Sequence, residues 1–349
     1  MVRKLILLFT LMSLTNSPAL SEQRLGSWTR LTSQLCYPGG GGYDPILVNN
    51  TVFIYEGLTM SDLSTPRPYE MSTILPSGEL SSWVIVPDSK LGEVGYTDVY
   101  TISAHGYLYA FGGWNYELVD GFSTSVLRSK INPGKDQILG PWEKIQTWVE
   151  NMGGTKLFYN NRVYVFGGWA SKEVKYYEIF SDGSVSTCSY STTQLNHDRL
   201  DSSALMIDSC VFITGGVSGG INQVERAVIY PDGEVGAFTD ISMTMALHKR
   251  PGLVKVGNYL YVLGGVWGGN FEYRDEHTLI NPDLTLGPWQ KGPYFPEPRY
   301  SNFLRTDMGV YAIGGTIYGV NNDGPTTYVD FAPIIEGTDV EDKYWSELE

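Results

Sequence analysis

The sequence is poor in cysteine, in basic residues and in long apolar runs, and each shortage excludes a class of protein. Three cysteines in 349 residues (Cys36, Cys188 and Cys210) are too few for a disulfide-stapled fold, although one bridge with a thiol left over stays open. Lys and Arg number 24 against 38 Asp and Glu, which gives a net charge of −14. Nucleic acids and anionic membrane surfaces attract basic patches, so we expect neither as a partner.

The one marked apolar run lies at the N-terminus. Arg3 and Lys4 precede an apolar stretch at residues 5–14, and small residues follow at Ala19-Leu20-Ser21. This pattern predicts a secretory signal peptide over residues 1–21, the alternative being a buried N-terminal helix. No later stretch is long and apolar enough to cross a bilayer. We therefore expect a secreted or periplasmic mature chain that does not insert into a membrane.

Helical periodicity is nearly absent, whereas glycine (40 residues) and tyrosine (24 residues) are abundant, as is typical of one large all-β domain. An apolar segment that ends in a glycine pair recurs along the chain. Its copies are Leu108–Gly113, Val163–Gly168, Val211–Gly216, Leu260–Gly265 and Val310–Gly315, with a degenerate copy ending in Glu56-Gly57. The first glycines of the five clear pairs are 55, 48, 49 and 50 residues apart. A fixed period near fifty residues predicts a repeat architecture.

A second signal alternates with the first. A leucine two or three residues before an aromatic follows a turn rich in Pro, Asp and Gly, as at Pro282-Asp283 before Leu286-Gly287-Pro288-Trp289. Such turns connect the strands of hairpins, so a strand is expected on either side. Each repeat then contains four antiparallel strands, a to d, with the glycine pair after strand b, and four strands every fifty residues predict a propeller blade.

These marks resemble the kelch-repeat family: the glycine pair after strand b, the aromatic of strand d, and Pro-Glu-Pro-Arg at residues 296–299 before a strand a. The resemblance spans roughly residues 25–335 and implies an all-β, six-bladed kelch-type β-propeller. Departures occur at Glu56-Gly57 and at Cys188 and Phe238, which replace an expected Trp. They weaken single blades rather than the assignment.

The order of the strands predicts how the ring closes. The chain opens with a strand-d segment at residues 25–31, and its last repeat ends with a strand c near residues 328–332. We therefore expect the N-terminal strand to complete the last blade, which leaves few exposed sheet edges. A competing closure uses Tyr344-Trp345 as the last strand d. The expected organisation is a signal peptide (1–21), a propeller (22–335) and an acidic tail (336–349).

Functional residues are expected on the disc face that carries the longer b–c and d–a loops. Arg199, Arg250 and Arg299 lie 16, 14 and 15 residues before the next glycine pair, so equivalent blades would bring them together at the channel mouth. Such a cluster would bind a carboxylate or phosphate. The alternative is that these arginines join adjacent blades through backbone carbonyls. Kelch adaptors that capture acidic peptides use arginines on this face, which is what the resemblance adds.

Aromatic and histidine side chains add to the same face. Trp114, Trp169, Trp267 and Tyr318 follow glycine pairs and suit sugar faces or peptide side chains, unless they fold back over the blade edge. His197 and His248 lie in d–a loops near the arginines, either for acid–base chemistry or for hydrogen bonds within the loops. No recognised metal-ligand spacing occurs, and neither a metal nor a cofactor is expected.

Two functions of different classes follow. The first is an exported binding module for an anionic glycan or an acidic peptide or protein partner. The second is a carbohydrate-active enzyme, because exported six-bladed kelch proteins include periplasmic sialic-acid mutarotases that the overall plan resembles in length, signal peptide and fold. In that case an arginine would hold the sugar carboxylate while Glu297, His197 or His248 moves a proton. The second function rests on fold alone, so the sequence favours the binding module without excluding the enzyme.

Overall fold

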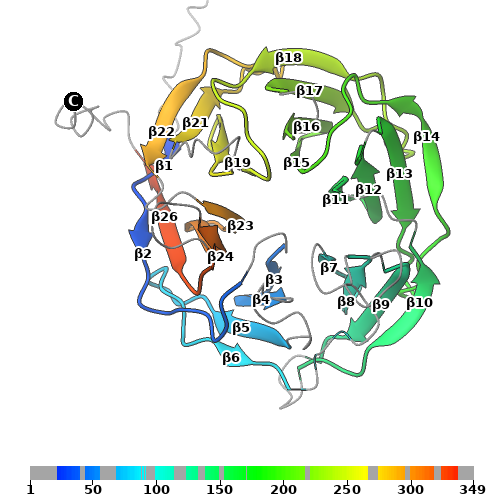
Figure 1. Ribbon diagram of the computed structural model, residues 1–349, viewed down its shortest axis with the longest axis vertical. Coiled ribbons are helices and arrows are strands. Elements are labelled where there is room, and N and C mark those ends of the chain that lie inside the picture. The colour runs from blue at the N-terminus through cyan, green and yellow to red at the C-terminus, as the bar shows by residue number, and fades with distance from the viewer. Residues whose placement is uncertain are drawn as a thin grey trace, which may run out of the picture.

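The computed structural model is a ring of six four-stranded antiparallel blades (Figure 1). It describes residues 22–39, 44–55, 68–87, 89, 91, 99–113, 123–132, 138–148, 153–169, 171–216, 221–265, 274–294, 299–317 and 324–336. Across these ranges no helix is present, and so none that could cross a membrane. The all-β six-bladed prediction is confirmed. The predicted signal peptide (1–21) and all of the acidic tail beyond residue 336 lie outside the described residues, so both stay predictions.

Strand a of each blade faces the central axis and strand d lies at the rim (Figure 1). The first three blades contain β3 (Ile46–Val48), β4 (Thr51–Tyr55), β5 (Tyr69–Thr73) and β6 (Val84–Ile85); β7 (Tyr100–Ala104), β8 (Tyr107–Phe111), β9 (Ser125–Lys130) and β10 (Glu143–Thr147); and β11 (Thr155–Tyr159), β12 (Arg162–Phe166), β13 (Glu173–Glu178) and β14 (Ser189–Gln194). The fourth and fifth contain β15 (Ser202–Ile207), β16 (Cys210–Gly215), β17 (Gln223–Val228) and β18 (Thr239–Met243); and β19 (Gly252–Val256), β20 (Tyr259–Leu263), β21 (Arg274–Leu279) and β22 (Gln290–Tyr294).

The sixth blade is closed by the N-terminal segment, as the strand order predicted. Its inner strands are β23 (Arg299–Arg305), β24 (Gly309–Ile317) and β26 (Val329–Glu336), with β25 (Gly324–Pro325) paired to β24. At the rim, β1 (Gln23–Leu25) and β2 (Thr29–Arg30) both pair antiparallel with β26. Tyr344 and Trp345, which the competing closure would use, lie outside the described residues.

The c–d turns contain the aspartates that the sequence marked as turn residues. The Asp182 side chain accepts a hydrogen bond from the backbone N–H of Ser184 at 2.8 Å, and Asp283 accepts one from Thr285 at 3.0 Å. Such side-chain contacts two residues along the chain stabilise a reversal. The turns therefore form locally and fix the register of strands c and d.

Strand b is bonded to the next blade through its glycine pair, through a tyrosine or, as in β12 and β24, through both, whereas β4 and β16 carry a phenylalanine at the tyrosine position. At one end, the N–H groups of Gly168 and Gly216 donate to carbonyls of the following d–a loop, those of Arg199 and His248, at 2.7 Å. At the other end, the hydroxyl of a strand-b tyrosine donates to the c–d turn of the next blade, as from Tyr164 to the Gly233 carbonyl at 2.9 Å. These two contacts tie the blade-to-blade seams.

The same tyrosine contact closes the ring. The Tyr311 hydroxyl of the sixth blade donates to the Gly78 carbonyl of the first blade at 2.8 Å. Between the seams, strand-b side chains such as Val163, Tyr164 and Phe166 are buried. Where Trp is missing from strand d, Phe238 is buried beside Phe166 in the next seam, so this departure leaves the packing intact.

The Gly215→Ala variant should be clearly less stable. The φ of Gly215 is 76°, a region that costs a residue with a Cβ about 1–2 kcal/mol. An added Cβ would also lie 2.7 Å from the His248 carbonyl oxygen. Gly287→Ala is the matched control, because its nearest neighbour would be 3.5 Å away and its φ is ordinary, so a change within about 1 kcal/mol is expected. Equal losses in urea denaturation would contradict the seam argument.

Candidate functional site

Four blades carry a buried acid at one equivalent position of strand c, which the sequence analysis missed. The position pairs with the strand-b residue two before the glycine pair. Its occupants are Glu70, Glu225, Glu276 and Asp330, all at most 2% exposed, with Leu127 and Lys175 in the other two blades. A buried carboxylate needs compensating donors. The available signal was the recurrence of an acid at the same position of strand c in four repeats.

Each of these acids holds the loop that enters its own blade. Glu70 accepts from the backbone N–H groups of Cys36 and Tyr37 at 2.7 and 2.9 Å. Glu276 accepts from those of Met245 and Ala246, both at 2.7 Å. These hydrogen bonds fix the d–a loops to strand c of the blade that each loop enters.

Two of the three predicted arginines take part in this anchoring rather than in the channel mouth. Arg199 is fully buried and donates from Nε to Glu225 at 2.7 Å and from Nη1 to the Gly215 carbonyl at 2.6 Å. Arg299 is also fully buried, and its Nη2 lies 2.5 Å from Asp330 and 3.3 Å from the Ala312 carbonyl. Both arginines thus bind backbone carbonyls, as the alternative expected, but the carbonyls belong to their own blade rather than to an adjacent one.

In the fifth blade a histidine takes the place of the arginine beside the buried strand-c acid. His248 lies 16 residues before its glycine pair, as Arg199 does. It is buried, with Nδ1 2.9 Å from the Gly264 carbonyl and Nε2 3.3 Å from Glu276. Arg250, two residues further on, has a φ of 53° and pairs through Nε with Asp201 at 3.0 Å. The three arginines are therefore not brought together, and Arg250 alone among them lines the central cavity.

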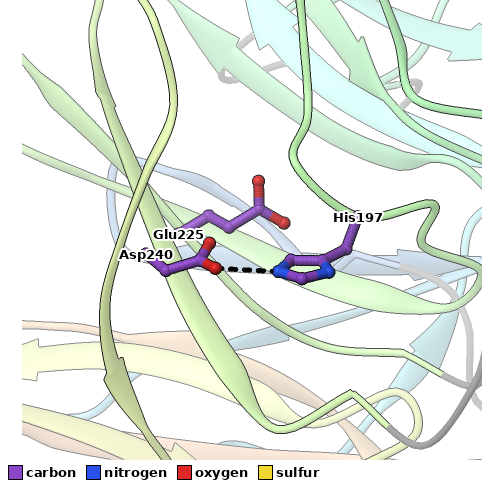
Figure 2. Close-up of side chains that lie close together, drawn as sticks. All are labelled: His197, Glu225 and Asp240. Atoms are coloured by element: carbon purple, nitrogen blue, oxygen red, sulfur yellow. Dashed lines mark hydrogen bonds and ion pairs between the residues drawn. The ribbon is translucent and has the colours of Figure 1, made fainter.

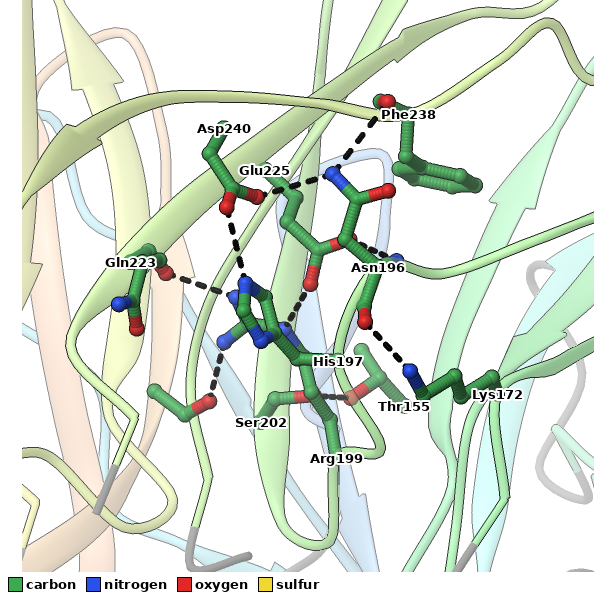
Figure 3. A network of polar contacts seen from close by, with 11 residues as sticks. Thr155, Lys172, Asn196, His197, Arg199, Ser202, Gln223, Glu225, Phe238 and Asp240 are labelled. Carbon is green, nitrogen blue, oxygen red and sulfur yellow. Dashed lines mark hydrogen bonds and ion pairs between the residues drawn. The ribbon is translucent and has the colours of Figure 1, made fainter. Parts of the chain in front are cut away.

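His197 lies in a separate polar cluster above the fourth blade. Figure 2 shows its imidazole facing Asp240, with Nε2 2.9 Å from Oδ2, and Glu225 close by. Potential metal-ligand atoms of the three residues lie within 4.8 Å of one another. However, the wider network of Figure 3 already engages both Glu225 oxygens, through Arg199 and the Asn196 N–H, and Asn196 also donates to Asp240. The cluster fixes the loop without requiring an ion.

The best candidate site is a cavity of about 230 Å³ at the upper mouth of the central channel. Every blade contributes to it, mostly through the first residues of strand a. The residues that pair with the last residue before each glycine pair are Tyr100, Thr155, Ser203, Gly252 and Asn302, and all of them line the cavity. Their side chains are mostly buried and already hydrogen-bonded within the protein, as from Ser203 to the Pro251 carbonyl and from Asn302 to the Ile313 carbonyl.

Charged groups stand at this mouth. Asp201 lies between two cations, Arg250 and Lys249, with Lys249 Nζ 3.4 Å from its second oxygen. Lys156 and Asp44 also line the cavity. Asp44 reaches the solvent of the cavity but is surrounded by the blades, and this desolvation raises its pKa to about 6, with Lys156 opposing the shift. The cavity lining holds two cations (Lys156 and Arg250) and two anions (Asp44 and Asp201), and Lys249 adds a cation beside Asp201, so the mouth is less acidic than the whole chain, which carries −14.

The predicted aromatic residues are tested at one position. Trp169 is 64% exposed after its glycine pair, so it does not fold back over the blade edge. Trp114, Trp267 and Tyr318, and also Glu297, lie outside the described residues, and their roles stay predictions.

All three cysteines are free, and burial raises the pKa of the Cys36 thiol to about 11, so that thiol is a weak nucleophile.

No protein-family model matches the chain. Kelch repeat and BTB domain-containing protein 13 from Homo sapiens is 32% identical over 100 residues, which are 28% of this chain and 21% of that protein. The chain thus spans about a fifth of the length of this relative. The six-bladed ring, with a clear glycine pair in five of its repeats, and this similarity over part of the chain support a kelch-type propeller.

Arg199→Met should lower the free energy of unfolding by about 3–5 kcal/mol, because it leaves the buried Glu225 carboxylate without its charged partner. The double variant Arg199→Met/Glu225→Gln should recover part of the loss, since the amide is neutral and its oxygen still accepts from the Asn196 N–H. Arg250→Asn should cost less, about 1 kcal/mol, because this pair is only partly buried and Asp201 keeps Lys249 as a partner. Chemical denaturation measures all three, and an Arg199→Met variant as stable as Arg250→Asn would refute the anchoring role.

A buried carboxyl also links ring closure to pH. Asp275 is fully buried and accepts from the Trp28 indole N–H at 2.7 Å and from the Gly264 N–H at 3.1 Å. Burial raises its pKa to about 7, against these two hydrogen bonds and the nearby His248. The folded protein therefore binds this proton more tightly than the unfolded chain does. Through Asp275, stability is highest below about pH 4 and falls as pH rises to about 7.

Asp275→Asn should flatten this component of the pH profile. Between pH 5 and pH 8 the wild type should lose more unfolding free energy than the variant, because only the wild type must ionise a buried carboxyl. Urea denaturation at pH 5 and pH 8 measures the change in the free energy of unfolding for each protein. Subtracting the variant from the wild type cancels the contributions of the other titrating groups. Parallel profiles for the two proteins would show that Asp275 is already ionised at pH 5.

Proposed function

We propose that the chain is a binding module whose central cavity face holds an acidic segment of a partner protein. Kelch-type propellers generally serve as protein-interaction modules, which supports a binding role. The observation that carries the proposal is the pair of cations on the cavity wall, Arg250 and Lys156, with Lys249 beside Asp201. In a chain of net charge −14, these cations supply the charge that an anionic ligand requires.

An anionic glycan is the competing ligand, because its carboxylates offer the same chemistry to a guanidinium. The size of the cavity argues for the peptide. At about 30 Å³ per water, 230 Å³ holds roughly eight water molecules, which is below the volume of most small-molecule sites. One or two side chains of a peptide fit this space better than a chain of sugar rings does.

Export belongs to the same proposal. The first strand begins at Gln23, directly after the predicted signal peptide, so cleavage near residue 21 would leave the closing strand β1 intact. N-terminal sequencing of the mature protein should begin near Glu22. Retention of residues 1–21 would place the protein inside the cell instead.

Arg250→Asn should weaken binding of a fluorescein-labelled hexaglutamate peptide by at least about tenfold, since a charge-assisted hydrogen bond contributes about 1.5–3 kcal/mol. Asparagine is chosen because it tolerates the positive φ of this position. Lys291→Asn is the matched control, with the same loss of charge on the outer strand β22. Fluorescence polarisation measures both, alongside a hyaluronan oligosaccharide as the glycan probe. Equal affinities for the two variants, or no binding by the wild type, would refute the proposal.

A carbohydrate-active enzyme is the second candidate, and one observation favours it. Asp44 lines the cavity with a pKa raised to about 6, and a carboxyl that titrates near neutral pH suits general acid–base catalysis. Arg250 would then hold the carboxylate of a sugar such as sialic acid. NMR would show faster mutarotation than in buffer, lost in Asp44→Asn. No acceleration by the wild type would exclude this candidate.

A further inference from the structure

A second cavity lies towards the opposite face of the ring, the one that carries the a–b and c–d turns. Its volume is about 570 Å³, within the range of ligand sites. It borders β15, β19 and β23, the strands a of the last three blades, near the end of each strand. Its charged lining residues are Lys255 and Arg305, both basic. We call these two residues the lower cations.

The lower cations have little compensation within the part of the chain that the structure describes. Arg305 Nη1 lies 3.4 Å from Asp307, but both side chains are exposed, and such a surface pair contributes little. Lys255 forms no ion pair with any described residue. By contrast, Arg24 of β1 pairs with Glu22 at 3.1 Å. The lower cations are therefore available to an anion, whereas Arg24 already has one.

The described part of the chain ends beside this cavity. Glu336, its last residue, pairs with Gln23 where β26 and β1 lie side by side (Figure 1), and Gln23 lines the cavity. Gln23 also lies against the a–b turn of the fifth blade, where a Cβ added to Gly257 would collide with the Gln23 carbonyl. Residues 337–349 therefore continue the chain from the border of the cavity.

The charge of residues 337–349 is opposite to that of the cavity. This segment contains five acids and one lysine, and so a net charge of −4. The acids that come first after Glu336 are Asp339, Glu341 and Asp342. An extended chain rises about 3.3 Å per residue, so these acids can reach about 10 to 20 Å from Glu336. A short connection of this kind gives a millimolar effective concentration, at which weak ion pairs are sufficient for binding.

We propose that the acidic tail, residues 337–349, binds in the second cavity and places carboxylates of residues 339–342 on Lys255 and Arg305. This contact holds β26 and the closing strand β1 to strands a of the fifth and sixth blades. A free acidic peptide or a second copy of the chain is a poorer occupant, because neither starts at the border of the cavity. The inference goes beyond the proposed function, since the upper mouth and its ligand take no part in it.

Cross-linking of the unmodified full chain tests the inference directly. The carbodiimide EDC joins a carboxylate to a lysine amine only where the two are in contact. We expect Lys255 to be joined to Asp339, Glu341 or Asp342 in the monomer fraction from gel filtration, as identified by mass spectrometry after digestion with chymotrypsin. Lys291, exposed on the outer strand β22, is the internal control and should not be joined to the tail.

Limited proteolysis of charge variants supplies the second arm. In Lys255→Gln/Arg305→Gln, trypsin should cleave after Lys343 about fivefold faster than in the wild type, as expected when two exposed ion pairs are lost. The matched control is Lys130→Gln/Lys291→Gln, which removes the same charge at exposed positions of β9 and β22 and should keep the wild-type rate. Thermal denaturation followed by circular dichroism checks that both variants are folded.

Three results would overturn the inference. The first is a tail joined to Lys156 or Lys249 at the upper mouth, or to no lysine at all. The second is a Lys255 cross-link confined to the dimer fraction, which would show that the tail binds a second copy. The third is equal cleavage after Lys343 in the wild type and in Lys255→Gln/Arg305→Gln. None of these results decides the proposed function, which the Arg250→Asn comparison tests separately.

Discussion

The structure depends on hydrogen bonds that join strand b of one blade to the next blade at both ends. Glycine N–H groups reach the following d–a loop, as from Gly216 to His248, and a tyrosine hydroxyl reaches the following c–d turn, as from Tyr164 to Gly233. Both contacts need backbone that comes very close, so a side chain at the glycine pair would collide with the loop. This constraint is why the glycine pairs recur about every fifty residues. The hydrogen bond from Tyr311 to the Gly78 carbonyl makes the same contact between the last blade and the first.

The same constraint explains why most of the loop-face charges are not available to a ligand. A loop that packs on the glycine pair must itself be held, and buried acids of strand c hold it. In the fourth and sixth blades an arginine joins that contact, which removes Arg199 and Arg299 from the solvent. In the fifth blade His248 takes this role, and Arg250 is left at the cavity wall. The arginine at the cavity mouth thus arises from one exception to the repeat.

Sequence reasoning predicted the fold because the glycine pairs, the turn aspartates and the strand-d aromatics each satisfy a local backbone or packing requirement that recurs in every blade. It did not predict the arginine roles. Counting 14, 15 or 16 residues to the glycine pair treated three positions as equivalent, whereas a shift of two residues separates His248, buried in the anchor, from Arg250 at the cavity. The acids at Glu225 and Glu276 recur at one position of strand c, and this recurrence was a signal in the sequence, because a buried charge requires a partner.

Positions that the repeat does not constrain can carry different side chains in each blade, and such positions can make the protein specific for one ligand. Seam positions keep their chemistry from blade to blade, but the strand-a residues that face the channel mouth do not: Tyr100, Thr155, Ser203, Gly252 and Asn302 occupy one equivalent position with five different side chains. A six-fold arrangement of identical groups would bind only a symmetric ligand. The observed wall is asymmetric, with Lys156 on the third blade, Asp201 on the fourth and Arg250 on the fifth. A ligand is therefore bound there in one orientation, which is what a directional chain such as a peptide requires.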